Sequence, residues 1–163
     1  QVLYTIPTGS NPTGYTLSEE RRSQLLDIAA AHGLIVLEDD PYYFLQYSPE
    51  PVQSLFSMAP DRVLRFDSFS KVTSSGLRLG TVTGPPKLVD KINLHTQATN
   101  LHASGVSQAM LLSLFRHWAV GDKGVLADVG MDIHIKQVKR FYEQRCQQFL
   151  DAADRHLAGE RAP

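Results

Sequence analysis

The hydrophobic residues of this chain follow two different spacings. Mainly apolar runs lie at 2–6, 34–37 and 63–66, and each has the length of a β-strand. Between the first two runs, apolar positions recur with helical spacing over residues 19–32. A strand, a helix and a strand in this order predict a βαβ unit with parallel strands. The run at 34–37 has no polar break, which is typical of a strand buried on both faces.

The ends of these elements carry recognisable signals. Thr16 with Glu19 three residues later forms a capping box, which predicts the start of the first helix. Gly33 lies where a glycine commonly ends a helix. Residues 77–83 alternate in polarity and predict a fourth strand. Its connection to the third strand is too short for a helical crossover, so we expect an antiparallel pairing or an edge strand.

The second half of the chain has helical spacing throughout. We expect helices over 87–97, from a cap at Ser104 to Trp118, and in a long segment that ends near Leu157, followed by a frayed tail at 158–163. The spacing predicts an inward face for each of the last two helices. These faces comprise Val106, Met110, Leu111, Leu114 and Phe115, and then Val138, Phe141, Tyr142, Cys146, Phe149, Leu150, Ala153 and Leu157.

Composition narrows the class of protein. The 163 residues are 42% hydrophobic and 20% charged, which is enough for one domain with a core. The net charge of −1 gives no electrostatic reason to expect nucleic acid or an anionic membrane as a partner. No apolar run approaches the ~20 residues of a membrane span. The single cysteine, Cys146, favours a reducing intracellular compartment, cytoplasmic or mitochondrial, and the histidines lack the spacing of metal ligands, so no metal is expected.

The polar residues after the third apolar run have the chemistry of a reactive amine beside a phosphate site. Lys71 follows the run within a few residues, and lysine amines form Schiff bases with aldehydes. Ser68, Ser70 and Arg78 surround it in the sequence and can donate several hydrogen bonds to phosphate oxygens. An aldehyde cofactor that carries a phosphate needs both functions. Pyridoxal 5'-phosphate is therefore the expected cofactor.

The other strand ends carry groups that suit the ring of this cofactor. Asn11 follows the first strand, and Asp39 and Tyr42 follow the second. Ligands of open α/β sheets bind outside the carboxyl ends of the strands, so we expect these residues near Lys71. A carboxylate beside the pyridine nitrogen keeps it protonated, while asparagine and tyrosine can hydrogen-bond the phenolic oxygen.

These motifs together resemble the class I/II aminotransferases, which are fold type I pyridoxal phosphate enzymes. The similarity lies in Ser-Asn-Pro-Thr-Gly at 10–14, Asp-Asp-Pro-Tyr at 39–42, and Ser-Phe-Ser-Lys at 68–71 with Arg78. It runs from residue 1 to about residue 157. Within the family, the chain is most similar to the kynurenine/2-aminoadipate aminotransferases, in the stretches 38–46, 67–71, 74–78, 83–85 and 100–102.

The resemblance implies an α/β fold of three layers with a mostly parallel sheet. Residues 1–163 would form an incomplete part of the large, cofactor-binding domain. The implied activity is transamination between an amino acid and a 2-oxo acid, in a homodimer. By position in the motifs, the catalytic residues would be Lys71, Asp39 and Tyr42, and the cofactor-binding residues Asn11, Asp39, Tyr42, Ser68, Ser70, Lys71 and Arg78.

Each implied role is specific. Lys71 would form the Schiff base and move a proton between the substrate Cα and C4′ of the cofactor. Asp39 would pair with the pyridine nitrogen in preference to Asp40. Asn11 and Tyr42 would bind the phenolic oxygen, and the phosphate would lie on Ser68, Ser70 and Arg78.

Two other functions stay open. Family members also carry an aromatic residue upstream that stacks on the cofactor, and an arginine downstream that binds the substrate carboxylate. Neither is recognisable here. A truncated form that binds the cofactor or pairs with full-length subunits without catalysing transamination is therefore an alternative. A transcription regulator that uses this fold behind a DNA-binding segment is a third.

Overall fold

The computed structural model describes residues 1–48, 50–119 and 128–157, and the expected tail at 158–163 lies outside them. In this described part, four strands form one sheet in the order β1-β2-β3-β4. Their bounds are Val2–Thr5, Ile35–Asp39, Val63–Ser68 and Gly80–Thr83. The pairs β1–β2 and β2–β3 are parallel and β3–β4 is antiparallel. The predicted α/β fold and its mostly parallel sheet are confirmed.

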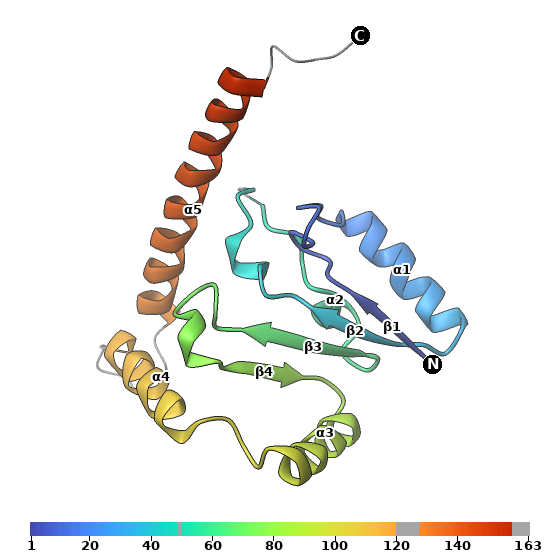
Figure 1. The fold of residues 1–163 in the computed structure, drawn as a ribbon. Helices are drawn as coiled ribbons and strands as arrows, with labels where there is room; N and C mark the ends of the chain where they lie inside the picture. Colours follow the sequence, from blue (N-terminus) through green and yellow to red (C-terminus); the bar gives the residue numbers. More distant parts are fainter. Residues whose placement is uncertain (49, 120–127, 158–163) are drawn as a thin grey trace.

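Helices occupy both ends of this sheet and extend beyond it (Figure 1). Helix α1 runs beside β1 and β2, while α5 starts beside α4 and leads away from the strands. The elements are α1 (Glu19–Ala31), α2 (Leu55–Met58), α3 (Pro86–Thr99), α4 (Gly105–Trp118) and α5 (Asp128–Leu157), with 3₁₀ turns η1 (Tyr43–Leu45) and η2 (Ser75–Leu77).

The start of α1 differs from the prediction. Ser18, not Thr16, is the N-cap, and its side chain accepts a hydrogen bond from the backbone N–H of Arg21. The Thr16 hydroxyl accepts instead from the N–H of Gly9, across the loop that precedes the helix. The predicted stop is confirmed, because Gly33 follows the helix with φ of +60°, a conformation that glycine adopts without strain.

The fourth strand is shorter than predicted. Residues 75–77 form η2, and Arg78 adopts a left-handed conformation with φ of 52°, so the extended region begins only at Gly80. A β-carbon on Gly80 would lie 2.5 Å from the carbonyl oxygen of Asp67, so only glycine fits there. The expectation of an antiparallel edge strand is confirmed.

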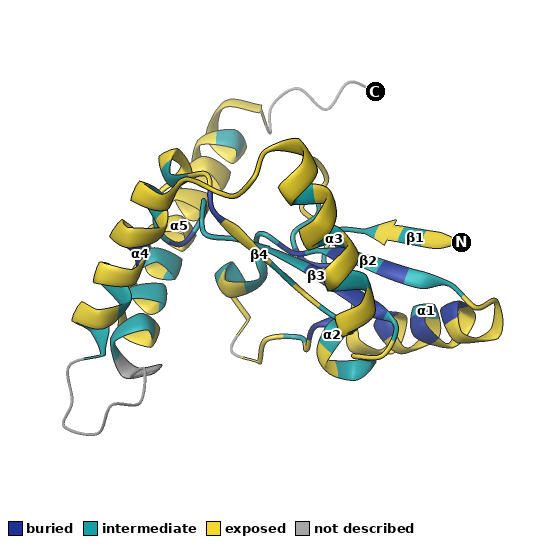
Figure 2. Ribbon diagram, turned by 90° about the horizontal axis from the view of Figure 1, so that it is seen from below, coloured by how far each residue is buried: buried dark blue, intermediate teal, exposed yellow. Residues whose placement is uncertain are grey.

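The core lies between the sheet and the two helices α1 and α2. Leu26 and Ala29 of α1 pack with Val36, Leu55 and Val63. Burial along β2 alternates, with every second residue fully buried, and Figure 2 shows the buried positions gathered on the strands and on the inner side of α1. The prediction that this strand is buried on both faces is therefore wrong for the described residues.

The predicted inward faces of α4 and α5 are largely exposed (Figure 2). In α4 only Leu111 is buried, and Val106 and Met110 are 73% and 58% exposed. In α5, Phe149 is 72% exposed and Cys146 is exposed as well. Helical spacing shows that these side chains share a face, but the described residues cover only part of it, at positions such as Leu111 and Phe115. Within the described ranges, no helix combines the length and the apolar character needed to cross a membrane.

Candidate active site

The carboxyl ends of β2 and β3 bring Tyr42 and Lys71 together. Both strands are parallel, so the segments that follow them leave the same edge of the sheet. The Lys71 Nζ lies 5.6 Å from the centroid of the Tyr42 ring. The two side chains share a cavity of about 500 Å³ with the loop residues Thr8 and Gly9 and with Tyr142 of α5. The expected meeting of these two strand ends is confirmed.

Asp39 lies at the end of β2 on the face of the sheet away from α1. Successive residues of a strand point to opposite faces, so Asp39 faces one side while Glu38 and Asp40 face the other. The carboxylate of Asp39 accepts a hydrogen bond from the hydroxyl of Tyr4 in the neighbouring strand β1. This bond and the nearby charge of Asp39, with some burial, raise the pKa of the Tyr4 phenol. Sequence reasoning missed Tyr4, because it took this residue only as part of a strand.

The expected phosphate ligands lie at the end of β3 and in the segment that follows it: Ser68 is the last residue of β3, Ser70 comes directly after the strand, and Arg78 follows η2. Ser68 and Ser70 are half-buried, and Arg78 is exposed. One guanidinium nitrogen of Arg78 lies 3.5 Å from the Ser70 hydroxyl and donates to the carbonyl of Ser75 at 3.2 Å. The Ser68 hydroxyl accepts from the N–H of Ser70 at 3.2 Å. The structure therefore places these three side chains around one turn, next to Lys71.

Asn11 is exposed in the loop between β1 and α1 and is not among the cavity-lining residues. The loop itself is held by backbone bonds from Ser10 N–H to the Tyr15 carbonyl and from Gly14 N–H to the Ser10 carbonyl. Asn11 is thus fixed near this edge of the sheet, without a direct contact to Lys71 among the described interactions.

The donors in this region fit an anionic aldehyde. Among the described residues, the ion pairs include neither Lys71 nor Arg78, so neither cation is neutralised by a carboxylate. The hydroxyls of Ser68 and Ser70 add donors beside them. A phosphate needs such donors, and a Schiff base needs an amine that is not held by a carboxylate.

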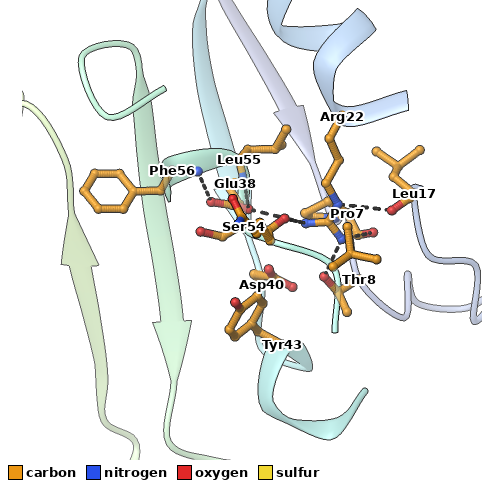
Figure 3. Close-up of polar contacts among 12 residues, drawn as sticks. Pro7, Thr8, Leu17, Arg22, Glu38, Asp40, Tyr43, Ser54, Leu55 and Phe56 are labelled. Carbon is orange, nitrogen blue, oxygen red and sulfur yellow. Dashed lines mark hydrogen bonds and ion pairs between the residues drawn. The ribbon is translucent and has the colours of Figure 1, made fainter. Parts of the chain in front are cut away.

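Behind the site lies a buried polar cluster that sequence reasoning missed (Figure 3). Arg22 of α1 is fully buried and points from the helix toward the loop after β1. Its guanidinium donates to the carbonyls of Leu17, Gln53 and Pro7 and to the Thr8 hydroxyl, at 2.9–3.1 Å. One side chain therefore fixes α1, the Asn11 loop and the segment before α2 to one another.

Glu38 occupies the centre of the cluster. Its two carboxylate oxygens accept from the N–H groups of Leu55 and Phe56, at 2.6 and 2.9 Å. The same carboxylate lies 3.9 Å from Arg22 and 3.8 Å from Arg65. These contacts supply acceptors for two free N–H groups at the start of α2 and place two cations beside the buried carboxylate of Glu38.

Asp40 completes the cluster and is not available to a ligand on the other face. It is 1% exposed, and its carboxylate lies 3.6 Å from the guanidinium of Arg65 with no hydrogen bond of good geometry. Burial raises the pKa of Asp40 to about 6, although the Thr8 hydroxyl and the charge of Arg65 act in the opposite direction. The environments of Asp39 and Asp40 thus differ sharply, and Asp39 is the one that lies on the open face.

Comparison with known proteins identifies the family. Residues 5–153 match the family model described as aminotransferase class I and II. The mitochondrial kynurenine/alpha-aminoadipate aminotransferase of Mus musculus is 44% identical over 158 residues, which cover 96% of this chain and 35% of the mouse protein. Aminotransferase tdiD of Emericella nidulans is 40% identical, over 98% of this chain and 36% of its own length. The chain thus spans about a third of the length of these curated relatives.

Solved structures agree with the sequence match. LysN, the alpha-aminoadipate aminotransferase of Thermus thermophilus, superposes with a TM-score of 0.86 at 31% identity, over 96% of this chain and 38% of that one. The kynurenine aminotransferase of Pyrococcus horikoshii has a TM-score of 0.78 at 34% identity, over 94% and 36%. The resemblance seen in the motifs is confirmed, and so is the fold type I architecture. The chain belongs to the aminotransferase class I and II family.

Proposed function

We propose that this chain provides the cofactor-binding part of a pyridoxal-phosphate-dependent aminotransferase. The observation that carries the proposal is the pairing of Lys71 and Tyr42 in one cavity, beside the donors of Ser70 and Arg78. Pyridoxal phosphate, when bound, supplies a ring that withdraws electrons from the substrate Cα. Two solved relatives are complexes, the Pyrococcus horikoshii enzyme with PMP and LysN with N-(5'-phosphopyridoxyl)-L-leucine.

The residues of this chain have distinct tasks in the proposal. Lys71 binds the cofactor aldehyde and carries the proton that moves to and from the substrate Cα. Asp39 would face the ring nitrogen and favour its protonated form, because an opposite charge nearby raises the pKa of that nitrogen. Asn11 and Tyr42 would donate to the phenolic oxygen. Ser68, Ser70 and Arg78 would hold the phosphate.

The relatives support a proposal for the substrate class. The mitochondrial kynurenine/alpha-aminoadipate aminotransferases of mouse and rat are 44% and 43% identical to this chain. We therefore propose a kynurenine or 2-aminoadipate type of amino donor with a 2-oxo acid acceptor, in a homodimer in the mitochondrion or cytoplasm.

The assignment of Lys71 is tested by chemical trapping. The purified chain is incubated with pyridoxal phosphate, reduced with borohydride and mapped by peptide mass spectrometry. We expect the pyridoxyl group on Lys71. The exposed lysines Lys87 and Lys91 of α3 serve as internal controls. A label on either of them in place of Lys71 contradicts the proposal.

A second proposal concerns the 163-residue chain by itself. It spans about a third of its curated relatives, and the arginine that binds the substrate carboxylate in the family is not recognisable in it. Without that clamp, the substrate Cα loses the proximity gain that can reach about 7–11 kcal/mol. We expect no conversion to the pyridoxamine form when the loaded chain meets 2-aminoadipate or kynurenine. Conversion at an enzymatic rate, followed by absorbance, contradicts this second proposal alone.

A further inference from the structure

Two helices outside the sheet, α4 and α5, contact the turn that carries Lys71 from different sides. On one side, the ring of Phe69 lies edge-on to Phe115 of α4, with centroids 5.9 Å apart. On the other, Nε2 of His134 in α5 lies 2.6 Å from the backbone oxygen of Val72. Val72 directly follows Lys71 and is 3% exposed.

These two contacts belong to one series of stacked rings that runs from Phe69 to His134. Phe115 contacts Trp118 at 5.9 Å between centroids, and Trp118 lies against the ring of His134 at 4.8 Å. Gly130 allows this approach, because a β-carbon there would lie 2.5 Å from the carbonyl oxygen of Trp118. Packing against Trp118 therefore fixes the orientation of the imidazole that contacts Val72.

The chemistry of the contact fixes its direction. A backbone carbonyl only accepts hydrogen bonds, so Nε2 of His134 must carry the proton and donate it. Within the turn, the N–H groups of Val72 and Thr73 donate to the carbonyl of Phe69. The hydrogen bond from His134 thus connects the Val72 end of this turn to α5.

We propose that His134 is a positioning residue for Lys71. By donating to the Val72 carbonyl, it fixes the turn so that the Lys71 amine is directed into the cavity that Tyr42 and Tyr142 line. The inference rests on the proposed role of Lys71 as the amine that binds the cofactor aldehyde. It gives α5 a function in the site, although α5 contributes none of the residues expected to bind the cofactor.

Two substitutions separate the hydrogen bond from the packing. His134→Leu keeps a similar volume without a donor, whereas His134→Gln places an amide N–H near the position of Nε2. His156→Leu makes the same change at an exposed position of the same helix and is the matched control. Hydrogen exchange of the peptide over residues 69–75 reports the turn without any cofactor, and exchange over α1 reports the rest of the fold.

We expect His134→Leu to speed exchange of the 69–75 peptide by about tenfold or more and to slow borohydride trapping at Lys71 by a similar factor, since small misplacements of reacting groups have effects of this size. His134→Gln should regain most of both, and His156→Leu should match the unsubstituted chain. Unchanged exchange in His134→Leu overturns the proposal. A His134→Gln protein that behaves like His134→Leu also overturns it. If His134→Leu fails to fold, the His134→Gln protein decides: fast exchange of its 69–75 peptide overturns the proposal.

The proposed function fails separately, when the unsubstituted chain is labelled at another lysine. The exchange measurement still judges His134 in that case.

Discussion

The guanidinium of Arg22 lies 3.9 Å from the carboxylate of Glu38, and neither side chain is exposed to solvent. The pair joins α1 to the strand that ends in Asp39. Burial lowers the pKa of Arg22, while the carboxylates of Asp40 and Glu38 oppose this effect. A buried pair of this kind contributes less by its attraction than by the penalty that follows when one partner is removed.

Removing Arg22 should therefore destabilise the chain strongly. We expect Arg22→Met to lower the free energy of unfolding by about 3–5 kcal/mol, because Glu38 is left buried with less compensation and three loop carbonyls lose their donor. Urea unfolding followed by circular dichroism measures the change. Arg21→Met, on the exposed side of the same helix, is the control and should shift stability by no more than about 0.5 kcal/mol. Equal midpoints for the two variants would contradict the structural role of Arg22.

Asp40 predicts a specific pH dependence of stability. Its folded pKa of about 6 lies above its ordinary value of 3.8, so the folded chain binds the proton more tightly than the unfolded chain. The contribution of Asp40 to stability therefore falls as pH rises from about 4 to 6, and is recovered on acidification. Since one pKa unit corresponds to about 1.4 kcal/mol, we expect this contribution to change by about 2–3 kcal/mol.

The measurement compares the unsubstituted chain with Asp40→Asn by urea unfolding between pH 4.5 and 7.5. The stability difference should shift in favour of the unsubstituted chain at the acidic end, since only that chain gains the proton. Asp61→Asn, at an exposed aspartate, is the control and should leave the pH profile unchanged. A constant difference between the Asp40→Asn and unsubstituted chains across this range would show that Asp40 titrates normally.

Sequence predicts the frame of the sheet well because its signals are local. Gly33 and Ser104 mark helix ends through their own backbone or side-chain bonds, and the order of strands follows from short connections. Arg22 was out of reach for the opposite reason. A basic residue on a helix is ordinarily solvated, and its burial depends on carbonyls of Pro7 and Gln53 that lie far away in the sequence.

The candidate site shows the same division. Motifs indicated Lys71, Asp39 and Tyr42, and the parallel strands explain why their segments leave one edge of the sheet. The bond from Tyr4 to Asp39 depends on the register of β1 against β2, which periodicity does not specify. Helical spacing also predicted burial along α5, but spacing defines a face without naming what covers it.

Gly130 should be sensitive to the smallest possible substitution. In Gly130→Ala, the added methyl group meets the backbone of Trp118 at 2.5 Å, so α4 and α5 must separate. We expect a loss of about 1–3 kcal/mol, together with a shift in the fluorescence of Trp118, which is the only tryptophan of the sequence. Gly105→Ala at the start of α4 meets nothing within 4 Å and should be neutral or stabilising by up to about 1 kcal/mol. Unchanged fluorescence and stability in Gly130→Ala would contradict the close packing.

Asp39 and Asp40 can be distinguished through the cofactor itself. With pyridoxal phosphate labelled with ¹⁵N in the ring, the nitrogen chemical shift reports whether that atom is protonated. We expect Asp39→Asn to lower the pKa of the bound ring nitrogen by about 1–3 units, because the opposite charge beside it is lost. Asp40→Asn, whose side chain faces away from this side of the sheet, should leave the shift unchanged. An effect in Asp40→Asn alone would transfer the role to that residue.

The sequence separation between Arg22 and its partners has a consequence for how the chain folds as it leaves the ribosome. Arg22 completes its bonds only when Gln53 is present, and Glu38 receives its donors from Leu55 and Phe56. The first strand and α1 therefore emerge before Arg22 can have its full set of partners, which requires some thirty further residues. Contacts between such distant positions form late in folding. We expect nascent chains that end before residue 53 to be sensitive to protease, and chains that extend past β3 to be the first that resist it.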